Sequence, residues 1–344
     1  MPQEKICLAS DNFTPTHPLI IEAILEANQG YAAPYGSDPW TLRAEETIQK
    51  IFQTDPKVLI LPTGTSSNVL ALKIACQRYE SVICTDIAHI QHQESGSAES
   101  IVGCKLLIVP HVNGKITAAN ILRKLSCEKA FGKHSTSPRV VSISQPTEVG
   151  TVYSLEELKE LASLCKEENL LFHIDGSRFY NAAAFLQIPL YKMIEGISLD
   201  LLSLGGTKNG LMCAEALLIF NPTLRKGADH LHKQNLCLLS KMRFISAQYI
   251  TFFQTELWLT LAQHANQKAQ EIASCIAKKT QLSLSYPVET NQIFFTAPPY
   301  IIPIIQDKIL CYLWDSEKHE IRLITSWCTT PQEIQMAQNH FINL

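Results

Sequence analysis

Seven short apolar runs, separated by segments of helical character, constrain the fold of this chain more than any other feature. Near-continuous apolar runs are typical of strands that are covered on both faces, as in a mostly parallel sheet. The clearest helix starts at Ser154, where Glu157 completes a capping box. The pattern therefore predicts a doubly wound α/β domain, with a seven-stranded, mostly parallel sheet and helices on both faces. The runs cover residues 58–61, 82–84, 106–109, 140–143, 170–174, 201–204 and 216–220.

A smaller unit is expected at the end of the chain. After residue 220 the pattern is helical to about residue 279, and strand-like stretches follow near 293–295, 310–313 and 321–324. A last helix is expected after Pro331, because proline suits a first helical turn. We therefore predict a large α/β domain over residues 1–255, including an N-terminal arm, and a small α+β domain over residues 256–344.

Composition excludes several classes of protein. A formal net charge of −3 gives no reason to expect a nucleic-acid partner. No apolar run reaches the length of a membrane helix, and residues 1–5 lack the apolar core of a signal peptide. The eleven cysteines include no Cys-x-x-Cys pair, so we expect no disulfide framework and no metal site. Reduced thiols in the cytoplasm are the simplest explanation.

Two polar features follow the first two runs. Residues 62–68, Pro-Thr-Gly-Thr-Ser-Ser-Asn, come directly after a predicted strand and open a helix. Gly64 permits close backbone approach, and the hydroxyl of Thr65 lies beside free helical N–H groups, which suits a phosphate. Alone, this stretch is more often an ordinary helix cap. His89 follows the second run, where a neutral imidazole can stack on an aromatic cofactor or relay a proton, although a lone histidine is usually structural.

Two further features carry opposite charges. Asp175 ends a predicted buried strand, where a carboxylate is costly unless a cation such as a pyridinium nitrogen pairs with it. Pairing with Arg178 or capping the next helix explains Asp175 equally well. Lys208 lies in Gly-Gly-Thr-Lys-Asn-Gly at residues 205–210, between two apolar runs, where its amine can act as a nucleophile towards an aldehyde. We expect the flanking glycines to let a planar ring lie against the backbone.

With these residues in order, the chain resembles the low-specificity L-threonine aldolases, in the β-eliminating-lyase branch of the fold-type-I enzymes that use pyridoxal 5'-phosphate (PLP). The likeness runs nearly from end to end, and its most specific signal is the pair of motifs around Asp175 and Lys208. The resemblance implies the PLP-dependent transferase fold and aldol cleavage of threonine or allo-threonine to glycine and acetaldehyde. The matching stretches are residues 9–12, 35–38, 63–68, 88–89, 147–153, 175–178, 205–210, 240–244, Arg322 and 326–327.

The resemblance also implies roles at the cofactor. Lys208 would hold PLP as a Schiff base, Asp175 would pair with the pyridine nitrogen, and His89 would stack on the ring. Gly64 and Thr65 would hold the phosphate. Arg243, with Lys233 or Lys241, would complete the phosphate site across a subunit boundary, as expected for a homodimer or homotetramer with shared active sites.

Substrate roles follow in the same way. The resemblance implies that Ser10, Arg178 and Arg322 hold the substrate carboxylate, with Arg178 also close to the cofactor. Arginine suits this task because its planar fork binds a carboxylate through two hydrogen bonds. A solvated charge on an edge strand is the alternative for Arg322.

The sequence does not decide which group is the general base. One branch of the family has histidine at the position of Glu148, whereas a bacterial branch carries the same Thr-Glu-Val-Gly as residues 147–150. Asn12 replaces a common threonine and Ser177 a common alanine. Catalytic candidates are thus Lys208, with His89, Glu148 or a water between them as base.

Three other functions remain as alternatives. β-Elimination or transamination would use the same PLP scaffold, and threonine and cysteine as test substrates would separate them. A cofactor-free binding protein is disfavoured because Lys208, Asp175, Arg178 and Arg322 are all present. A generic nucleotide-binding function is less well supported still, since the sequence contains neither a dinucleotide-binding nor a P-loop fingerprint.

Overall fold

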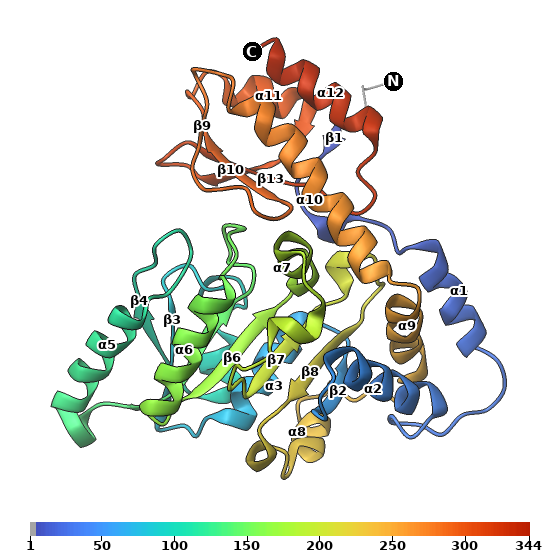
Figure 1. Ribbon diagram of the computed structural model, residues 1–344, viewed down its shortest axis with the longest axis vertical. Coiled ribbons are helices and arrows are strands. Elements are labelled where there is room, and N and C mark those ends of the chain that lie inside the picture. Colours follow the sequence, from blue (N-terminus) through green and yellow to red (C-terminus); the bar gives the residue numbers. More distant parts are fainter. Residues whose placement is uncertain (1–4) are drawn as a thin grey trace.

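The computed structural model describes residues 5–344, and a seven-stranded sheet forms its centre (Figure 1). Every predicted run forms a strand of this sheet. β8 runs antiparallel to both of its neighbours and the other four pairs are parallel, so the sheet is mostly parallel, as predicted. In spatial order the strands are β2 (Lys57–Leu61), β8 (Glu215–Ile219), β7 (Leu201–Leu204), β6 (Leu171–Gly176), β5 (Ser137–Ser144), β3 (Glu80–Thr85) and β4 (Lys105–Val109).

Helices cover both faces of the sheet, as expected for a doubly wound domain. One face packs on α1 (Pro18–Ala27), α2 (Pro39–Phe52), α5 (Ala118–Phe131), α6 (Leu155–Glu167), α7 (Phe179–Leu186) and α9 (Arg243–Gln254). The other face packs on α3 (Gly64–Ala75), α4 (His89–His92) and α8 (Ala228–Gln234). The capping box of Ser154 and Glu157 starts α6, which confirms the sequence signal for this helix.

The strand directions bring several loops to one edge of the sheet. β6 and β7 are parallel, so the chain leaves both at the same edge. The loop after β5 and the start of α3 lie at this edge as well. In an open α/β sheet, the carboxyl ends of the strands form the binding crevice.

A small lobe follows the long helix α10 (Leu257–Ile276) and lies at the top of Figure 1. Its core joins α10, α11 (Ile302–Lys308) and α12 (Pro331–Ile342) to an antiparallel sheet. This lobe is α+β, as predicted. The strands are, in spatial order, β12 (Tyr312–Asp315), β13 (Glu320–Ile324), β10 (Gln292–Thr296) and β9 (Ser283–Leu284).

The beginning of the chain is attached to this small lobe. β1 (Ile6–Cys7) pairs in parallel with β11 (Ile309–Leu310), and the Leu8 carbonyl accepts a hydrogen bond from the N–H of Ile324. The N-terminal arm therefore begins on the small lobe. The predicted division between residues 255 and 256 stays a prediction, and residues 1–4 of the predicted large domain lie outside the described residues.

Two further expectations concern cysteines and membranes. All eleven cysteines are free thiols in this structure, and most are buried. Across residues 5–344, no helix is both long enough and apolar enough to span a bilayer.

Candidate active site

A cavity of about 450 Å³ opens where the strands of the large sheet end. Its walls come from segments that are far apart in the sequence, including the start of α3, the end of β6 and the turn after β7. The sequence-predicted residues Gly64, Thr65, His89, Asp175 and Lys208 all line it. The other lining residues are Asn12, Pro62, Thr63, Asn68, Gln93, Glu94, Ser177, Ser203, Thr207, Cys213 and Glu215.

Lys208 lies in the short 3-10 helix Thr207–Asn209, directly after β7. Lys208 is half-buried, and desolvation lowers the pKa of its amine below the ordinary value. The neighbouring charge of Arg178 lowers this pKa further, whereas Asp11 and Asp175 act in the opposite direction. A lysine with a lowered pKa offers more of the neutral amine, which is the nucleophilic form.

Asp175 occupies the end of β6 and is buried. Its Oδ1 accepts a hydrogen bond from the N–H of Ser177 at 3.0 Å, and its Oδ2 accepts one from Asn68 Nδ2 at 2.8 Å. Burial by itself would raise the pKa of Asp175, but the charges of His89 and Lys208 and these hydrogen bonds outweigh it. The pKa is therefore lowered and the carboxylate stays ionised.

His89 begins α4, and its ring is held by a residue that the sequence did not single out. Nδ1 of His89 lies 2.9 Å from Oε1 of Glu94, whose side chain is only 1% exposed. His89, Glu94 and Asp175 each place one possible metal-ligand atom within 4.8 Å of the others. The Asn68 amide already donates a hydrogen bond to both carboxylates, and the expectation of no metal stays a prediction.

The predicted phosphate turn begins α3. Thr63 caps this helix, because its hydroxyl accepts a hydrogen bond from the N–H of Ser66 at 3.2 Å. The first N–H groups of a helix have no partner within the helix, so those of Gly64 and Thr65 are free to bind an anion. Glu215 of β8 also lines this part of the cavity, and burial raises its pKa to about 7.

The glycines next to Lys208 have a different role from the one expected. A Cβ on Gly205 would come within 2.5 Å of the Ser177 carbonyl oxygen, and one on Gly206 would come within 2.5 Å of the Ala214 carbonyl oxygen. The space that a side chain would need is therefore filled by protein backbone, and neither glycine lines either of the cavities at this site. These glycines allow the turn to pack tightly, and this packing determines the position of the Lys208 backbone.

A second, smaller cavity of about 110 Å³ shares His89, Asp175 and Lys208 with the first. Ser10, Glu148, Arg178 and Arg322 line it, together with Asn12, Gln93, Ser144, Pro146, Thr147, Ser177, Gln292 and Trp314. The substrate residues named by the resemblance thus meet next to the cofactor residues.

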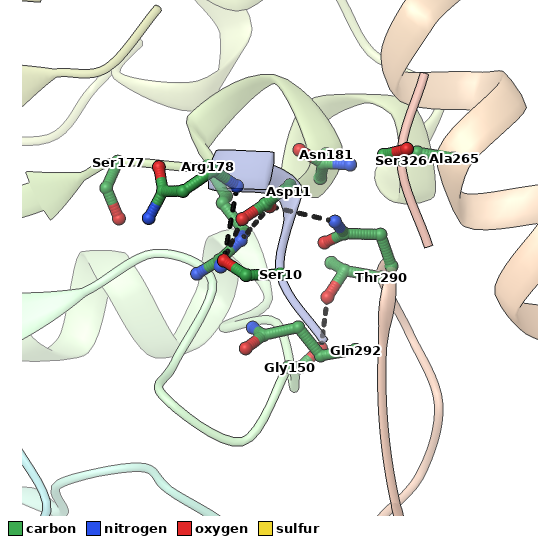
Figure 2. Close-up of polar contacts among 12 residues, drawn as sticks. Ser10, Asp11, Gly150, Ser177, Arg178, Asn181, Ala265, Thr290, Gln292 and Ser326 are labelled. Atoms are coloured by element: carbon green, nitrogen blue, oxygen red, sulfur yellow. Dashed lines mark hydrogen bonds and ion pairs between the residues drawn. The ribbon is translucent and has the colours of Figure 1, made fainter. Parts of the chain in front are cut away.

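Two arginines in this second cavity differ in how they are held. Arg178 donates two hydrogen bonds to Asp11, from Nε at 2.6 Å and from Nη2 at 2.8 Å (Figure 2). Arg322 lies over the rings of Tyr312 and Trp314, at 5.1 Å and 4.4 Å from their centroids. The buried Nε of Arg322 has no hydrogen-bond partner among the described residues. Such an orphaned donor suits an anionic ligand.

Glu148 lies in the loop after β5 and is half-buried against the second cavity. Its Oε1 accepts hydrogen bonds from Ser144 Oγ at 2.6 Å and from the N–H of His89 at 2.9 Å. Burial raises the pKa of Glu148, against the effect of these hydrogen bonds. A carboxyl group with a raised pKa is a stronger base when ionised.

The expected phosphate ligands Arg243, at the start of α9, and Lys233, on α8, do not line either cavity of this single chain. Arg243 donates a hydrogen bond to the Gly30 carbonyl oxygen at 3.0 Å and lies near the rings of Trp40 and Phe244. Lys233 lies over the ring of Tyr35, 3.9 Å from its centroid.

Sequence reasoning missed four side chains that hold the site together. Asn68 and Asp11 lay inside recognised motifs without an assigned role. Glu94 and Glu215 gave no local signal, because a single acidic residue in a polar turn or at a strand start is common. Only the folded chain shows that these side chains are buried beside the predicted ones.

Comparison with known proteins identifies the family of this chain. A family model described as beta-eliminating lyase matches residues 8–298. The chain is 38% identical over 328 residues to a low specificity L-threonine aldolase of Pseudomonas aeruginosa, covering 95% of this chain and 94% of that protein. It is 29% identical over 295 residues to a yeast enzyme of the same name, from Saccharomyces cerevisiae, with 83% and 73% covered.

Solved structures give the same picture. The threonine aldolase of Leishmania major superposes with a TM-score of 0.92 at 28% identity, with 98% of each chain covered. An archaeal alanine:glyoxylate aminotransferase superposes with a TM-score of 0.71 at 16% identity, covering 99% of this chain and 90% of the other. That second likeness concerns the fold alone.

Proposed function

This chain belongs to the beta-eliminating lyase family, whose threonine aldolases depend on PLP, and we propose that it cleaves L-threonine and L-allo-threonine to glycine and acetaldehyde. One observation carries the proposal. The amine of Lys208 and the ionised carboxylate of Asp175 line one cavity, which a second cavity with two arginines adjoins. The chain is thus a PLP-dependent carbon–carbon lyase with a site suited to a small amino acid.

The residues of the first cavity fit the cofactor. Lys208 offers the amine that joins the cofactor aldehyde, and Asp175 offers the carboxylate that keeps a pyridine nitrogen protonated. Gly64 and Thr65 offer N–H groups and a hydroxyl to the phosphate, and His89 a ring for stacking. When bound, PLP supplies an electron-withdrawing ring that accepts the electron pair released by the breaking bond.

The second cavity suits the substrate carboxylate. Arg322 has an unused buried donor, while Arg178 is already held in place by Asp11. Together with the Ser10 hydroxyl, they provide hydrogen-bond donors in a partly desolvated pocket, in which a carboxylate is bound more strongly than in water. Binding there orients the amino acid so that its Cα lies near Lys208.

Proton transfer is the remaining task. A base must take the proton of the β-hydroxyl group so that the Cα–Cβ bond can break and the aldehyde can leave, and a proton must then return to Cα. Glu148 and His89 both line the second cavity, joined by the hydrogen bond from the His89 N–H. We favour Glu148, because desolvation raises the pKa of its carboxyl group, with a water between the two groups as the alternative.

The test is a product assay on the purified protein with added PLP. We expect glycine and acetaldehyde from both threonine diastereomers, and a visible absorbance band that borohydride shifts. Lys208→Ala is expected to lose the band and to lose cleavage by about 1,000-fold or more, whereas the exposed Lys226→Ala is expected to keep both. Pyruvate from cysteine, without glycine from threonine, would instead establish β-elimination, and amino transfer to a keto acid would establish an aminotransferase.

The proposal extends to assembly and location. We propose a homodimer or homotetramer in which Arg243, with Lys233 or Lys241, completes the phosphate site of a neighbouring subunit. Its support is the position of Arg243 outside both cavities of its own chain, and the exposure of apolar side chains such as Tyr31 (108%) and Leu236 (87%). Free cysteines support a cytoplasmic location.

A further inference from the structure

We propose that Glu94 is a positioning residue that holds both contacts to the cofactor ring, the His89 imidazole and, through Asn68, the Asp175 carboxylate. The inference rests on the proposed function only for its effect on turnover. The positioning of His89 and Asp175 by Glu94 concerns only the protein and its cofactor, so it can be measured without an amino-acid substrate.

The observation is one continuous set of hydrogen bonds. Glu94 Oε1 accepts from His89 Nδ1 at 2.9 Å and from Asn68 Nδ2 at 2.9 Å. The same Asn68 nitrogen donates to Asp175 Oδ2 at 2.8 Å. One carboxylate oxygen thus connects the residue expected above the ring with the residue expected at its nitrogen.

Three separate segments are needed to build this set. Asn68 lies on α3, Asp175 ends β6, and Glu94 follows α4 in a tight turn. Ser95 and Gly96 adopt left-handed backbone conformations, with φ of 52° and 68°, so the chain reverses directly after Glu94. This reversal keeps Glu94 beside the helix that carries His89.

The orientation of Asn68 follows from its two acidic neighbours. Its amide nitrogen has two hydrogens, and one goes to each carboxylate. The opposite orientation would place a carbonyl oxygen against two carboxylates. Asn68 Oδ1 is left buried without a partner among the described residues, which is a cost that the two charge-assisted bonds offset.

Glu94 also determines which nitrogen of His89 carries the proton. An ionised carboxylate only accepts hydrogen bonds, so Nδ1 must be the protonated nitrogen of the neutral ring. Nε2 then has no proton and the ring plane is fixed. A carboxylate that orients a histidine in this way is a recurrent arrangement in active sites.

Burial gives a second reason to assign a function to Glu94. Its side chain is 1% exposed, and its Oε1 lies 2.9 Å from Nδ1 of His89. Ser97 Oγ adds one long hydrogen bond to Oε2, at 3.4 Å. A buried carboxyl group needs hydrogen-bond donors around it, and these contacts connect Glu94 to two residues of the site, His89 and Asn68.

The experiment compares Glu94→Leu and Glu94→Gln with the wild type and with a control, Glu99→Gln, which changes an exposed glutamate nearby. The first readout is the ¹⁵N chemical shift of the His89 ring in the PLP-free protein at mildly alkaline pH, assigned with His89→Asn. We expect Nδ1 to be protonated in the wild type and in the control, and this preference to be lost in Glu94→Leu.

The second readout is the dissociation constant of PLP, followed by absorbance, and the third is kcat against KM for threonine. We expect Glu94→Leu to weaken PLP binding about tenfold and to lower kcat more than it raises KM, since second partners of site residues have effects of this size. Glu94→Gln keeps an acceptor oxygen and is expected to restore most of the PLP affinity.

Two results would overturn the proposal: a wild-type His89 protonated on Nε2, or an unchanged PLP affinity in a folded Glu94→Leu protein. If Glu94→Leu does not fold, the tautomer of His89 in the wild type decides, because a ring protonated on Nε2 would remove the role of Glu94. A protein that binds PLP as described but releases no glycine from threonine would refute the proposed function alone.

Discussion

At the scale of single residues, charge pairing explains why this site can hold a small zwitterion. Asp11 is buried, and burial alone would raise its pKa, but the guanidinium of Arg178 outweighs this and lowers the pKa. Asn291 adds a hydrogen bond to the same carboxylate at 3.1 Å. Arg178 is therefore held in one geometry before any substrate binds, while Arg322 keeps its Nε unused. The two arginines have separate tasks despite their shared charge.

The unused donor of Arg322 leads to a first prediction. Arg322→Lys keeps a positive charge but loses the planar fork that binds a carboxylate through two hydrogen bonds. We expect KM for threonine to rise about tenfold or more, with the PLP absorbance band unchanged, as steady-state kinetics and absorbance can measure. Unchanged KM would mean that Arg322 only stacks on Tyr312 and Trp314.

The raised pKa of Glu148 leads to a second prediction. Glu148→Gln preserves the shape and can still accept the hydrogen bonds from Ser144 and His89, but it cannot take a proton. We expect kcat for threonine cleavage to fall roughly 100-fold, with PLP affinity preserved. Turnover close to that of the wild type would assign the base to His89 or to water.

At the scale of elements, three neighbouring strands are joined by one histidine. His173 of β6 lies with Nδ1 2.9 Å from Ser142 Oγ of β5 and with Nε2 3.1 Å from Ser203 Oγ of β7. Burial lowers the pKa of His173 to about 4. The folded sheet therefore contains a neutral ring between two hydroxyls, next to the strand end that carries Asp175.

The lowered pKa of His173 leads to a prediction of how the stability of the protein depends on pH. Between about pH 4 and 6.5 the unfolded chain binds a proton at His173 that the folded chain does not, so the stability contribution is lost as the pH falls through this window. We expect the part of the free energy of unfolding due to His173 to fall by about 2 kcal/mol from pH 7 to pH 5. Urea denaturation at several pH values should show that the free energy of unfolding depends less steeply on pH in His173→Gln. The exposed His230→Gln should keep the wild-type pH dependence. Equal slopes for all three proteins would contradict the assignment.

Some parts of the fold and of the candidate site could be predicted from the sequence, and others are visible only in the folded chain. All seven strands, the helix from Ser154 and the α+β character of the C-terminal part could be predicted, because they depend on local apolar periodicity and capping. Asp175 and Lys208 were also recognisable, since charged groups at the ends of apolar runs stand out. The Asp11–Arg178 pair and the Glu94–Asn68 contacts were not, because they join residues whose neighbours in sequence carry no sign of the partner.

At the scale of the whole molecule, the two lobes meet at the substrate residues. Arg322 belongs to β13 of the small lobe, whereas Arg178 follows β6 of the large one. The Thr290 hydroxyl, next to β10, donates a hydrogen bond to the Gly150 carbonyl oxygen of the large lobe at 2.9 Å (Figure 2). Ser10 and Asp11 lie on the arm that joins β1 to the large lobe. Substrate affinity should therefore depend on how firmly the lobes are attached to each other.

Removing β1 tests this dependence. A protein that lacks residues 1–7 loses the pairing of β1 with β11 but keeps every residue of both cavities. We expect KM for threonine to rise about tenfold, since small displacements of binding groups have large effects, with the PLP band retained. A protein that lacks only residues 1–4 is the matched control, and equal KM values in the two proteins would contradict the dependence.

The reversed direction of β8 has a consequence for remodelling this enzyme. Because β7 and β8 are adjacent and antiparallel, the segment with Lys208 spans only the gap between Leu204 and Glu215, with no crossover helix to absorb a change in length. Gly205 and Gly206 leave no room for larger side chains. Libraries of variants that insert residues or shuffle loops should therefore spare this connection. They can instead sample the exposed stretch of residues 130–134, at the opposite edge of the sheet, where added length would leave the reactive amine in place.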